Sequence, residues 1–295
     1  MKKLNLAYPE TSDIKFEVSH FPDGQQDVRI LDPFDGLDPT TIISRLTSFK
    51  DVELILCATK ALRRLHTKEI HLYIPYLIGA RSDRQFIKGG TSYLHDVLAP
   101  IINAEKYESV TVLDPHSDVA SACIDNLEAL DNNELLRFAL SELYQPNTPD
   151  NFVLVSPDAG SLKKIYNAAA KIGFDGEYVI CSKYRNFRGD LSRIEAPVKE
   201  HNIHRDHIII DDICDGGRTF IEIAKAIKTS HPHFDGKIYL VITHGIFSNG
   251  FGELSEHIDK IFCTNSYKDL DPHDVTTNSV KSFKTSLMVK QLNVF

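Results

Sequence analysis

The stretch IIIDDICDGGRTF, Ile208–Phe220, combines a buried strand, an acidic loop and the start of a helix. Three isoleucines in a row are typical of a strand that is buried on both faces of a sheet. Apolar residues at helical spacing, from Ile221 to Ile227, predict a helix directly after Thr219. The stretch therefore predicts a strand–loop–helix unit, with its loop at the carboxyl end of a strand, where open α/β sheets bind ligands.

The loop of this unit carries groups that favour a phosphate and groups that repel one. Free N–H groups at the start of a helix attract an anion. Gly216 and Gly217 lack the Cβ atoms that would keep a phosphate away from the backbone. Asp211 and Asp212 suit hydroxyl groups or a divalent cation. The combination points to a sugar phosphate, or to a phosphate that arrives with a metal ion. The alternative is an ordinary acidic turn, although three acids with Gly-Gly-x-Thr exceed what a turn needs.

Composition is that of a globular protein without an extreme charge. The 295 residues are 42% hydrophobic and 25% charged, and the length predicts two domains or one large one. A formal charge of −8 argues against a general binder of nucleic acids or anionic membranes. The five scattered cysteines lack CxxC spacing and predict reduced thiols in a cytoplasmic protein. No apolar run is long enough to span a membrane, and the polar N-terminus does not resemble a signal peptide.

Strand-like and helix-like segments alternate along both halves of the chain. Phe16–Ile30 predicts a hairpin around Pro22-Asp23-Gly24. Further predicted strands are Ile70–Ile74, Ser109–Leu113, Phe152–Val155, Tyr178–Cys181 and Ile238–Thr243, and predicted helices are Asp51–Leu65, Leu94–Asn103 and Leu162–Lys171. This alternation implies parallel sheets. The polar, proline-containing segment Gln145–Asn151 is the most linker-like part of the chain, which predicts domains at 1–145 and 146–295.

The Ile208–Phe220 signature resembles the ribose-binding motif of proteins that use phosphoribosyl pyrophosphate (PRPP). Further motifs, described below, occur in the order found in the ribose-phosphate pyrophosphokinase family. The resemblance implies an α/β fold of two phosphoribosyltransferase-like domains, each a mainly parallel sheet flanked by helices. It further implies that the N-terminal domain binds ATP and that the C-terminal domain binds the ribose phosphate.

Phe21-Pro22-Asp23-Gly24 is similar to the family's adenine-contacting loop. This similarity implies that Phe21 stacks on the base and that Asp23 reads its amino group, often across a subunit interface. Gln25 stands where an acid is usual, and its amide can still hydrogen-bond. Without the other motifs, a buried phenylalanine before a hairpin turn is the simpler interpretation.

Ile74–Gln85 resembles the family's strand and loop that bring an arginine to the ATP phosphates. Arg81 offers a planar, permanently charged fork that suits phosphate oxygens. Asp83 and Arg84 match the family pattern too, whereas Ser82 replaces the usual glutamine. Taken alone, these residues are equally consistent with an exposed salt bridge.

Two loops at predicted strand ends resemble the family's metal-binding motifs. Asp114-Pro115-His116 is similar to its Asp-Leu-His motif, with Pro115 in place of leucine, and Ser156–Gly160 is similar to its Ser-Pro-Asp-x-Gly motif. The resemblance implies that His116 and Asp158 help to hold Mg²⁺ on the ATP phosphates. Mg²⁺ keeps several waters, so few protein ligands are expected. A polar loop residue is the alternative for a lone histidine.

Ser182-Lys183-Tyr184-Arg185 resembles the family's catalytic loop, whose two cations close over the triphosphate. Fixed cations stabilise the charge that builds on phosphoryl oxygens, so Lys183 and Arg185 become the candidate catalytic residues. Taken without the resemblance, a solvated basic loop is the simpler interpretation. Thr243–Ser248 is also similar to a family motif, but no chemistry is assigned to it.

The implied reaction transfers the β,γ-pyrophosphate of Mg·ATP to the C1 hydroxyl of ribose 5-phosphate and releases AMP. Positioning and charge neutralisation then carry most of the catalysis. The resemblance implies that Asp211, Asp212 and Asp215 hold ribose hydroxyls and a metal, and that Gly216, Gly217 and Thr219 take the 5-phosphate.

The loop Asp215–Thr219 departs from the family's usual Asp-Thr-Gly-Gly-Thr, because a hydroxyl donor is lost and Arg218 is inserted. The N-terminal region also leaves no room for a helix before Phe21. These departures suggest a larger acceptor such as ADP-ribose, with Arg218 on its second phosphate, as in phage relatives that rebuild NAD.

Two other classes stay open: a phosphoribosyltransferase and an inactive regulatory homologue. The first has no need for the Arg81 loop or the Lys183/Arg185 loop, and the second would be expected to lose the loop cations or His116, which this chain keeps. Family members generally assemble as dimers or hexamers, so a homo-oligomer is expected.

Overall fold

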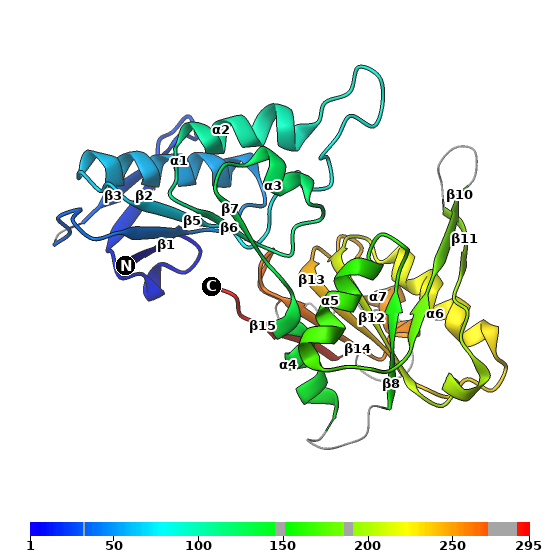
Figure 1. Cartoon of the computed structure of the whole chain (residues 1–295). Helices are drawn as coiled ribbons and strands as arrows, with labels where there is room; N and C mark the ends of the chain where they lie inside the picture. The colour runs from blue at the N-terminus through cyan, green and yellow to red at the C-terminus, as the bar shows by residue number, and fades with distance from the viewer. Residues whose placement is uncertain (32, 145–150, 186–190, 271–287) are drawn as a thin grey trace. The chain divides into compact units, whose positions relative to one another are not determined.

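The computed structural model describes residues 1–31, 33–144, 151–185, 191–270 and 288–295 (Figure 1). They form two compact units, Met1–Leu130 with Val294–Phe295, and Asp131–Asn293. The sequence places the division between residues 145 and 146, within a segment that lies largely outside the described residues. In the structure helix α4 (Asn133–Leu143) joins the second unit, because its Leu135, Leu136 and Ala139 share a core with Phe152 and Phe262.

The first unit is built on a five-stranded, fully parallel sheet with the order β1-β4-β5-β6-β7. The strands are β1 (Lys2–Asn5), β4 (Thr40–Ile43), β5 (Ile70–Tyr73), β6 (Val110–Leu113) and β7 (Leu127–Leu130). The helices are η1 (Pro9–Thr11), α1 (Phe49–Arg64), η2 (Leu94–Leu98), α2 (Ala99–Ala104) and α3 (Val119–Cys123). The helix expected at Leu94–Asn103 is present, but η2, its first part, is a π-helix.

Helix α1 is the amphipathic helix that the sequence predicts. Its N-terminus is fixed by a capping box between Ser48 and Asp51, and its apolar face packs into the core of the first unit. The predicted hairpin is also present, as β2 (Phe16–His20) and β3 (Gln26–Ile30). Gln26 anchors it to α1, because its Nε2 donates a hydrogen bond to the Lys50 carbonyl at 2.8 Å.

The second unit has a six-stranded, fully parallel sheet with the order β15-β14-β13-β12-β8-β9. Its strands are β8 (Phe152–Ser156), β9 (Tyr178–Ile180), β12 (Asp206–Cys214), β13 (Ile238–Gly245), β14 (Lys260–Thr264) and β15 (Met288–Leu292). Besides α4, its helices are α5 (Leu162–Ile172), η3 (Glu200–Asn202), α6 (Arg218–Ser230) and α7 (Gly252–His257).

The basic segment after β9, expected as a loop, forms strands at both ends. Strand β10 (Ser182–Arg185) pairs antiparallel with β11 (Leu191–Glu195), so that Ser182 lies opposite Glu195. Residues 186–190 between the strands lie outside the described residues.

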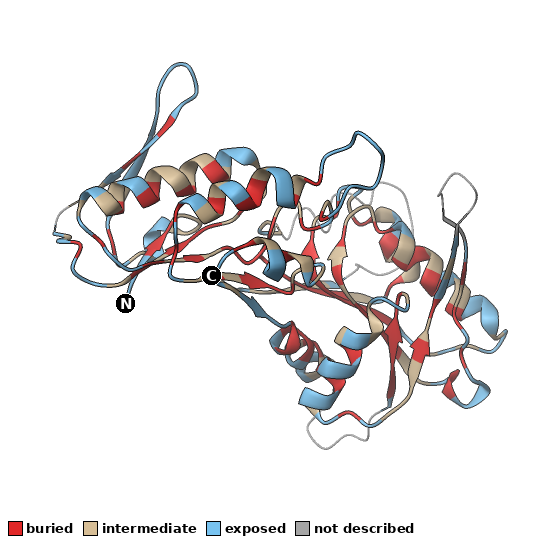
Figure 2. Cartoon of the chain, turned by 45° about the horizontal axis from the view of Figure 1, so that its top comes forward, coloured by how far each residue is buried: buried red, intermediate tan, exposed pale blue. Residues whose placement is uncertain are grey.

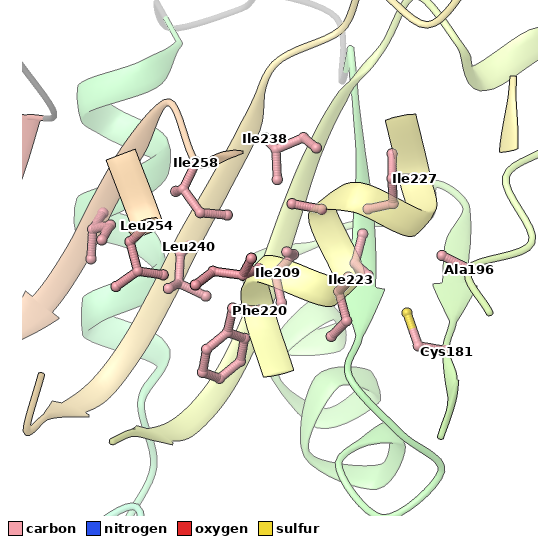
Figure 3. Packing of buried hydrophobic residues seen from close by; sticks show 14 of the residues in the cluster. Cys181, Ala196, Ile209, Phe220, Ile223, Ile227, Ile238, Leu240, Leu254 and Ile258 are labelled. Atoms are coloured by element: carbon pink, nitrogen blue, oxygen red, sulfur yellow. The ribbon is translucent and has the colours of Figure 1, made fainter. Parts of the chain in front are cut away.

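Successive side chains of β12 point to opposite faces of the second sheet, and both faces are covered by helices. Ile208 and Ile210 belong to the core that contains α4 and α5, whereas Ile209 belongs to the core that contains α6. Phe220, Ile223 and Ile227 of α6 share the second of these cores with Ile209, and Figure 3 shows Phe220 beside Ile209. Burial follows the same pattern, since the central strands are almost entirely buried (Figure 2).

Mainly parallel sheets flanked by helices confirm the predicted fold class. Among the described residues, no helix combines the length and the apolar character that crossing a lipid bilayer requires.

Candidate functional site

The signature stretch forms the predicted strand–loop–helix unit. Strand β12 runs as far as Cys214, so Asp211 and Asp212 belong to the strand and only Asp215–Gly217 form the turn. Gly217 precedes α6 with a φ of +82°, a left-handed conformation that favours glycine. Arg218 is the first residue of the helix and is exposed, and Thr219 follows it in the first turn.

A polar cluster connects the signature strand to two other predicted motifs of the second unit. Lys183 Nζ lies 2.7 Å from Oδ2 of Asp158 and donates a hydrogen bond to it. Ser161 donates from its backbone N–H and its hydroxyl to Oδ1 of Asp158, at 3.0 and 3.3 Å. The Ser161 hydroxyl also lies 3.2 Å from Oδ1 of Asp211. The structure therefore brings together Asp158, Lys183 and Asp211, which lie far apart in the sequence.

The cluster perturbs the ionisation of both aspartates, in opposite directions. Burial, followed by the negative charge of Asp212, raises the pKa of Asp211 well above its usual range. Burial also opposes ionisation of Asp158, but the hydrogen bond and the charge of Lys183 hold its pKa below the ordinary value. Opposed shifts of neighbouring carboxyl groups are typical of functional sites.

The cations predicted to be catalytic lie on strand β10. Lys183 is only 18% exposed in its ion pair with Asp158. Arg185 ends the same strand and pairs in register with Leu191, but its side chain lies outside the described part of the structure.

The predicted ATP-side loops of the first unit meet at Asp83. The buried carboxylate of Asp83 accepts hydrogen bonds from Arg84 Nε at 2.9 Å and from the Ser117 hydroxyl at 2.6 Å. Those bonds, led by the one from Arg84, lower the pKa of Asp83, and the charge of nearby His116 adds to the effect. Asp83 therefore fixes the Arg81 loop to the loop that carries His116.

Backbone strain marks the second of these loops. Asp114, directly after β6, has a φ of +42°, although it is not a glycine. Strained residues of this kind cluster at functional sites, where the surrounding structure holds them in place.

The remaining ATP-side candidates are exposed residues. Arg81 is an exposed residue of the partly buried loop that follows β5. Phe21, Asp23 and Gln25 form the tip of the β2–β3 hairpin, where Phe21 is 52% exposed. The Gln25 backbone N–H donates to Asp23 Oδ1 at 3.1 Å, which stabilises the turn. An exposed ring at a fixed turn is suited to stacking, and the alternative of a buried Phe21 is wrong.

Sequence reasoning missed three serines that connect the motifs. Ser161 links Asp158 to Asp211, Ser117 holds Asp83, and the Ser248 hydroxyl donates to Asp215 Oδ1 at 2.7 Å. Their position in the sequence could have indicated them, because each serine lies within three residues of a predicted motif residue or inside a motif. Residue type alone gives no such signal.

Oxygen donors for a divalent cation are present but sparse. The carboxylates of Asp158, Asp211 and Asp212 are ligands of the kind that Mg²⁺ prefers. Within the described residues, no three His, Cys, Asp or Glu side chains are placed to hold a metal together. A site with few protein ligands is still compatible with Mg²⁺, which keeps several waters.

Comparisons with known proteins agree with the predicted fold and with the family that the sequence resembles. No family model matches the chain. The ribose-phosphate pyrophosphokinase of Thermococcus kodakarensis is 26% identical over 269 residues, covering 86% of each chain. That of Thermosipho africanus is 29% identical over 255 residues, covering 85% of this chain and 77% of its own.

A solved structure extends the likeness to the whole fold. The phosphoribosylpyrophosphate synthetase of Mycobacterium smegmatis matches 96% of this chain and 88% of its own, with a TM-score of 0.75 at 19% identity. The fold is therefore the two-unit α/β class of phosphoribosylpyrophosphate synthetases. Together with the sequence matches, this makes the protein a divergent relative of the ribose-phosphate pyrophosphokinases, a family of transferases.

Proposed function

We propose that the protein transfers the β,γ-pyrophosphate of ATP to the C1 hydroxyl of a ribose 5-phosphate moiety and releases AMP. The observation that carries the proposal is the cluster in which Lys183 of β10 and Asp158 of the loop after β8 meet Asp211 of the signature strand. Such a cluster joins a candidate phosphoryl-stabilising cation to candidate metal and ribose ligands. The resemblance to the pyrophosphokinases predicts this combination, whereas a phosphoribosyltransferase has no need for the cation.

Each group has a role that its chemistry supports. Lys183 and Arg185 stabilise charge on the transferred phosphoryl oxygens, and they act most strongly where water is excluded. Arg81 and His116 bind the ATP phosphates, Asp83 holds their loops together, and Phe21 stacks on the adenine beside Asp23 and Gln25. The ribose phosphate is held by Asp211, Asp212, Asp215, Gly216, Gly217 and Thr219.

Mg²⁺ fits this assignment through the carboxylate of Asp158, with His116 as a second candidate ligand. When bound, Mg²⁺ would neutralise phosphate charge and orient the triphosphate. Lys183 takes Oδ2 of Asp158 in the structure, so ligation through that oxygen requires the ammonium group to move away. A homo-oligomeric assembly, dimer or hexamer, and a cytoplasmic location belong to the same proposal.

A second acceptor, ADP-ribose, is favoured by one specific feature. Arg218 is exposed at the first position of α6, directly after the phosphate-binding turn. A guanidinium at this position is suited to the second phosphate of a diphosphate. Transfer to ADP-ribose would give ADP-ribose pyrophosphate, an intermediate for rebuilding NAD.

The deciding experiment measures AMP release from Mg·ATP with ribose 5-phosphate and, separately, with ADP-ribose, using Lys183→Ala as the control. AMP formed with ribose 5-phosphate supports PRPP synthesis, and AMP formed only with ADP-ribose supports the second acceptor. If the wild-type protein releases AMP with neither compound, the proposal fails. The phosphoribosyltransferase and the inactive regulatory homologue are then the alternatives.

A further inference from the structure

The loop after β13 lies directly against the phosphate-binding turn of the second unit. The backbone N–H groups of Ile246 and Phe247 donate to the Cys214 carbonyl at 2.9 and 3.2 Å, and that of Ser248 donates to the Asp215 carbonyl at 3.2 Å. Asn249 Nδ2 donates to the Gly216 carbonyl at 3.3 Å. Successive residues of the loop after β13 thus donate hydrogen bonds to successive residues of the turn, so the two segments form one continuous surface.

Buried aromatic packing fixes the position of this loop. Phe247 and Phe251 are buried with ring centroids 4.7 Å apart. A Cβ on Gly245 would come within 2.2 Å of the Phe247 ring, so glycine is required for this close approach. The exposed residues Ser248 and Asn249 therefore project from a rigid base.

Asn249 occupies the space that a side chain at position 216 would need. A Cβ built on Gly216 would lie 2.8 Å from Asn249 Nδ2, closer than real Cβ atoms come to other atoms. Gly216 is also the position at which the signature lacks a hydroxyl donor. The side-chain amide of Asn249 thus lies where the side chain of residue 216 would be, and Gly216 itself has no side chain to donate a hydrogen bond.

The amide has a donor to spare for a ligand. A primary amide carries two N–H groups, and the Gly216 carbonyl takes one of them. The second can donate to a phosphate oxygen, and a hydrogen bond to a charged acceptor is stronger than one between neutral groups. Ser248 complements this arrangement, because its hydroxyl fixes the carboxylate of Asp215 at 2.7 Å.

We propose that Asn249 is a substrate-binding residue whose amide donates to the 5-phosphate of the ribose-phosphate acceptor, in place of a side chain at position 216, with Ser248 as a positioning residue for Asp215. This inference rests on the proposed function and deepens it, because it assigns part of the acceptor site to the loop after β13. It implies that acceptor affinity depends on Asn249, whereas ATP affinity does not.

The first test compares Asn249→Ala and Asn249→Asp with Asn167→Ala, which removes an exposed asparagine from α5. Asn249→Ala is expected to raise the KM for the acceptor about tenfold, the effect of one hydrogen bond to a charged group. Asn249→Asp is expected to raise it further, because a carboxylate repels phosphate. The KM for ATP and the Tm are expected to stay at the values of the wild type and the control. Equal acceptor KM values in all proteins, or a parallel rise of both KM values, would overturn the inference.

A compensation test uses the space shared by the two positions. Gly216→Ser alone is expected to impair acceptor binding, because its Cβ would displace the Asn249 amide from the Gly216 carbonyl. In an Asn249→Gly background the same serine has room and supplies a hydroxyl donor, so the acceptor KM is expected to return toward the wild-type value. If the double variant has a higher acceptor KM than either single variant, the two positions do not share the phosphate-binding role.

Direct binding separates this inference from the proposed function. If the wild type binds ribose 5-phosphate or ADP-ribose in calorimetry but releases no AMP, the proposed reaction fails, and a loss of binding in Asn249→Asp still supports the role of Asn249. If the wild type binds neither compound, the inference is overturned as well.

Discussion

The ammonium group of Lys183 lies 2.7 Å from Oδ2 of Asp158, so the candidate catalytic cation is paired with a candidate metal ligand. Lys183 is largely buried in this pair, whereas most ion pairs on protein surfaces are exposed and weak. A metal ion that uses Oδ2 must compete with the ammonium group for the same oxygen. Lys183 would then be released at the moment when a metal-bound triphosphate arrives.

Removal of Lys183 is therefore expected to strengthen metal binding while it slows catalysis. We expect Lys183→Gln to bind Mn²⁺ several-fold more tightly than the wild type in the absence of nucleotide, because a competing positive charge is lost. Electron paramagnetic resonance of free Mn²⁺ measures this affinity. Adding Asp158→Asn should cancel the gain, and unchanged or weaker Mn²⁺ binding in Lys183→Gln would exclude the competition.

Lys183→Ala is expected to slow AMP release by about 10²–10³-fold, the usual effect of removing one group that stabilises transition-state charge. Lys171→Ala is the matched control, because Lys171 forms an exposed ion pair with Asp131 in the same unit. Its rate should remain within about twofold of the wild type, since exposed ion pairs contribute little. Similar rates for wild type and Lys183→Ala would remove Lys183 from the mechanism.

Much of the fold could be predicted because local patterns and tertiary packing agree. The Ile208–Ile210 run forms a strand that is buried on both faces, and the residues after Gly217 form the predicted helix. Asp211 and Asp212 were expected to begin the loop, since aspartate is unfavourable in strands. They remain in β12 because Asp211 lies in register with Ile242 and Ile213 with His244 of the neighbouring strand.

The parts that could not be predicted depend on contacts between distant residues. Ser182 pairs with Glu195, and composition alone describes the segment between them as a basic loop. The bridge from Asp158 to Asp211 passes through Ser161, whose residue type carries no distinguishing signal. Motif order indicated the candidate loops, and only the fold shows which of their side chains meet.

Arg218 is expected to determine which acceptor the protein prefers. If its guanidinium binds a second phosphate, Arg218→Ala should lower kcat/KM for ADP-ribose at least about tenfold, as expected for the loss of a charge-assisted contact. The value for ribose 5-phosphate should change little. Lys225→Ala, which removes a positive charge from the exposed face of the same helix, serves as the control. Equal losses of kcat/KM with both acceptors would mean that Arg218 contributes only its positive charge to the site and does not contact the second phosphate.

His207 connects the stability of the second unit to pH. Its side chain is fully buried near the start of β12, against the ring of Phe234. Nδ1 donates to the Arg205 carbonyl at 2.9 Å, whereas Nε2 finds no hydrogen-bond partner among the described residues. Burial lowers the pKa of His207 below its ordinary value, although the hydrogen bond to the Arg205 carbonyl and the charge of Asp206 partly oppose the shift.

The direction of the pH effect follows from this lowered pKa. In the unfolded chain His207 binds a proton near its ordinary pKa of about 6.5, whereas the folded protein resists protonation. The unfolded state thus binds more protons as the pH falls below about 6.5, and the free energy of unfolding decreases by up to about 1.4 kcal/mol per pH unit until the folded-state pKa is reached. Urea unfolding of the wild type and His207→Gln at pH 7.5 and 5.5, followed by circular dichroism, measures this dependence.

His207→Gln is expected to be less stable than the wild type at pH 7.5, because it alters a buried site, but to lose less stability between the two pH values. His233→Gln, at an exposed position, should keep the wild-type dependence. The comparison uses the change in the free energy of unfolding between the two pH values. A general packing defect in His207→Gln lowers that free energy at both pH values and therefore does not produce the expected difference. Identical pH dependence in the wild type and His207→Gln would mean that His207 takes up its proton equally well in the folded protein.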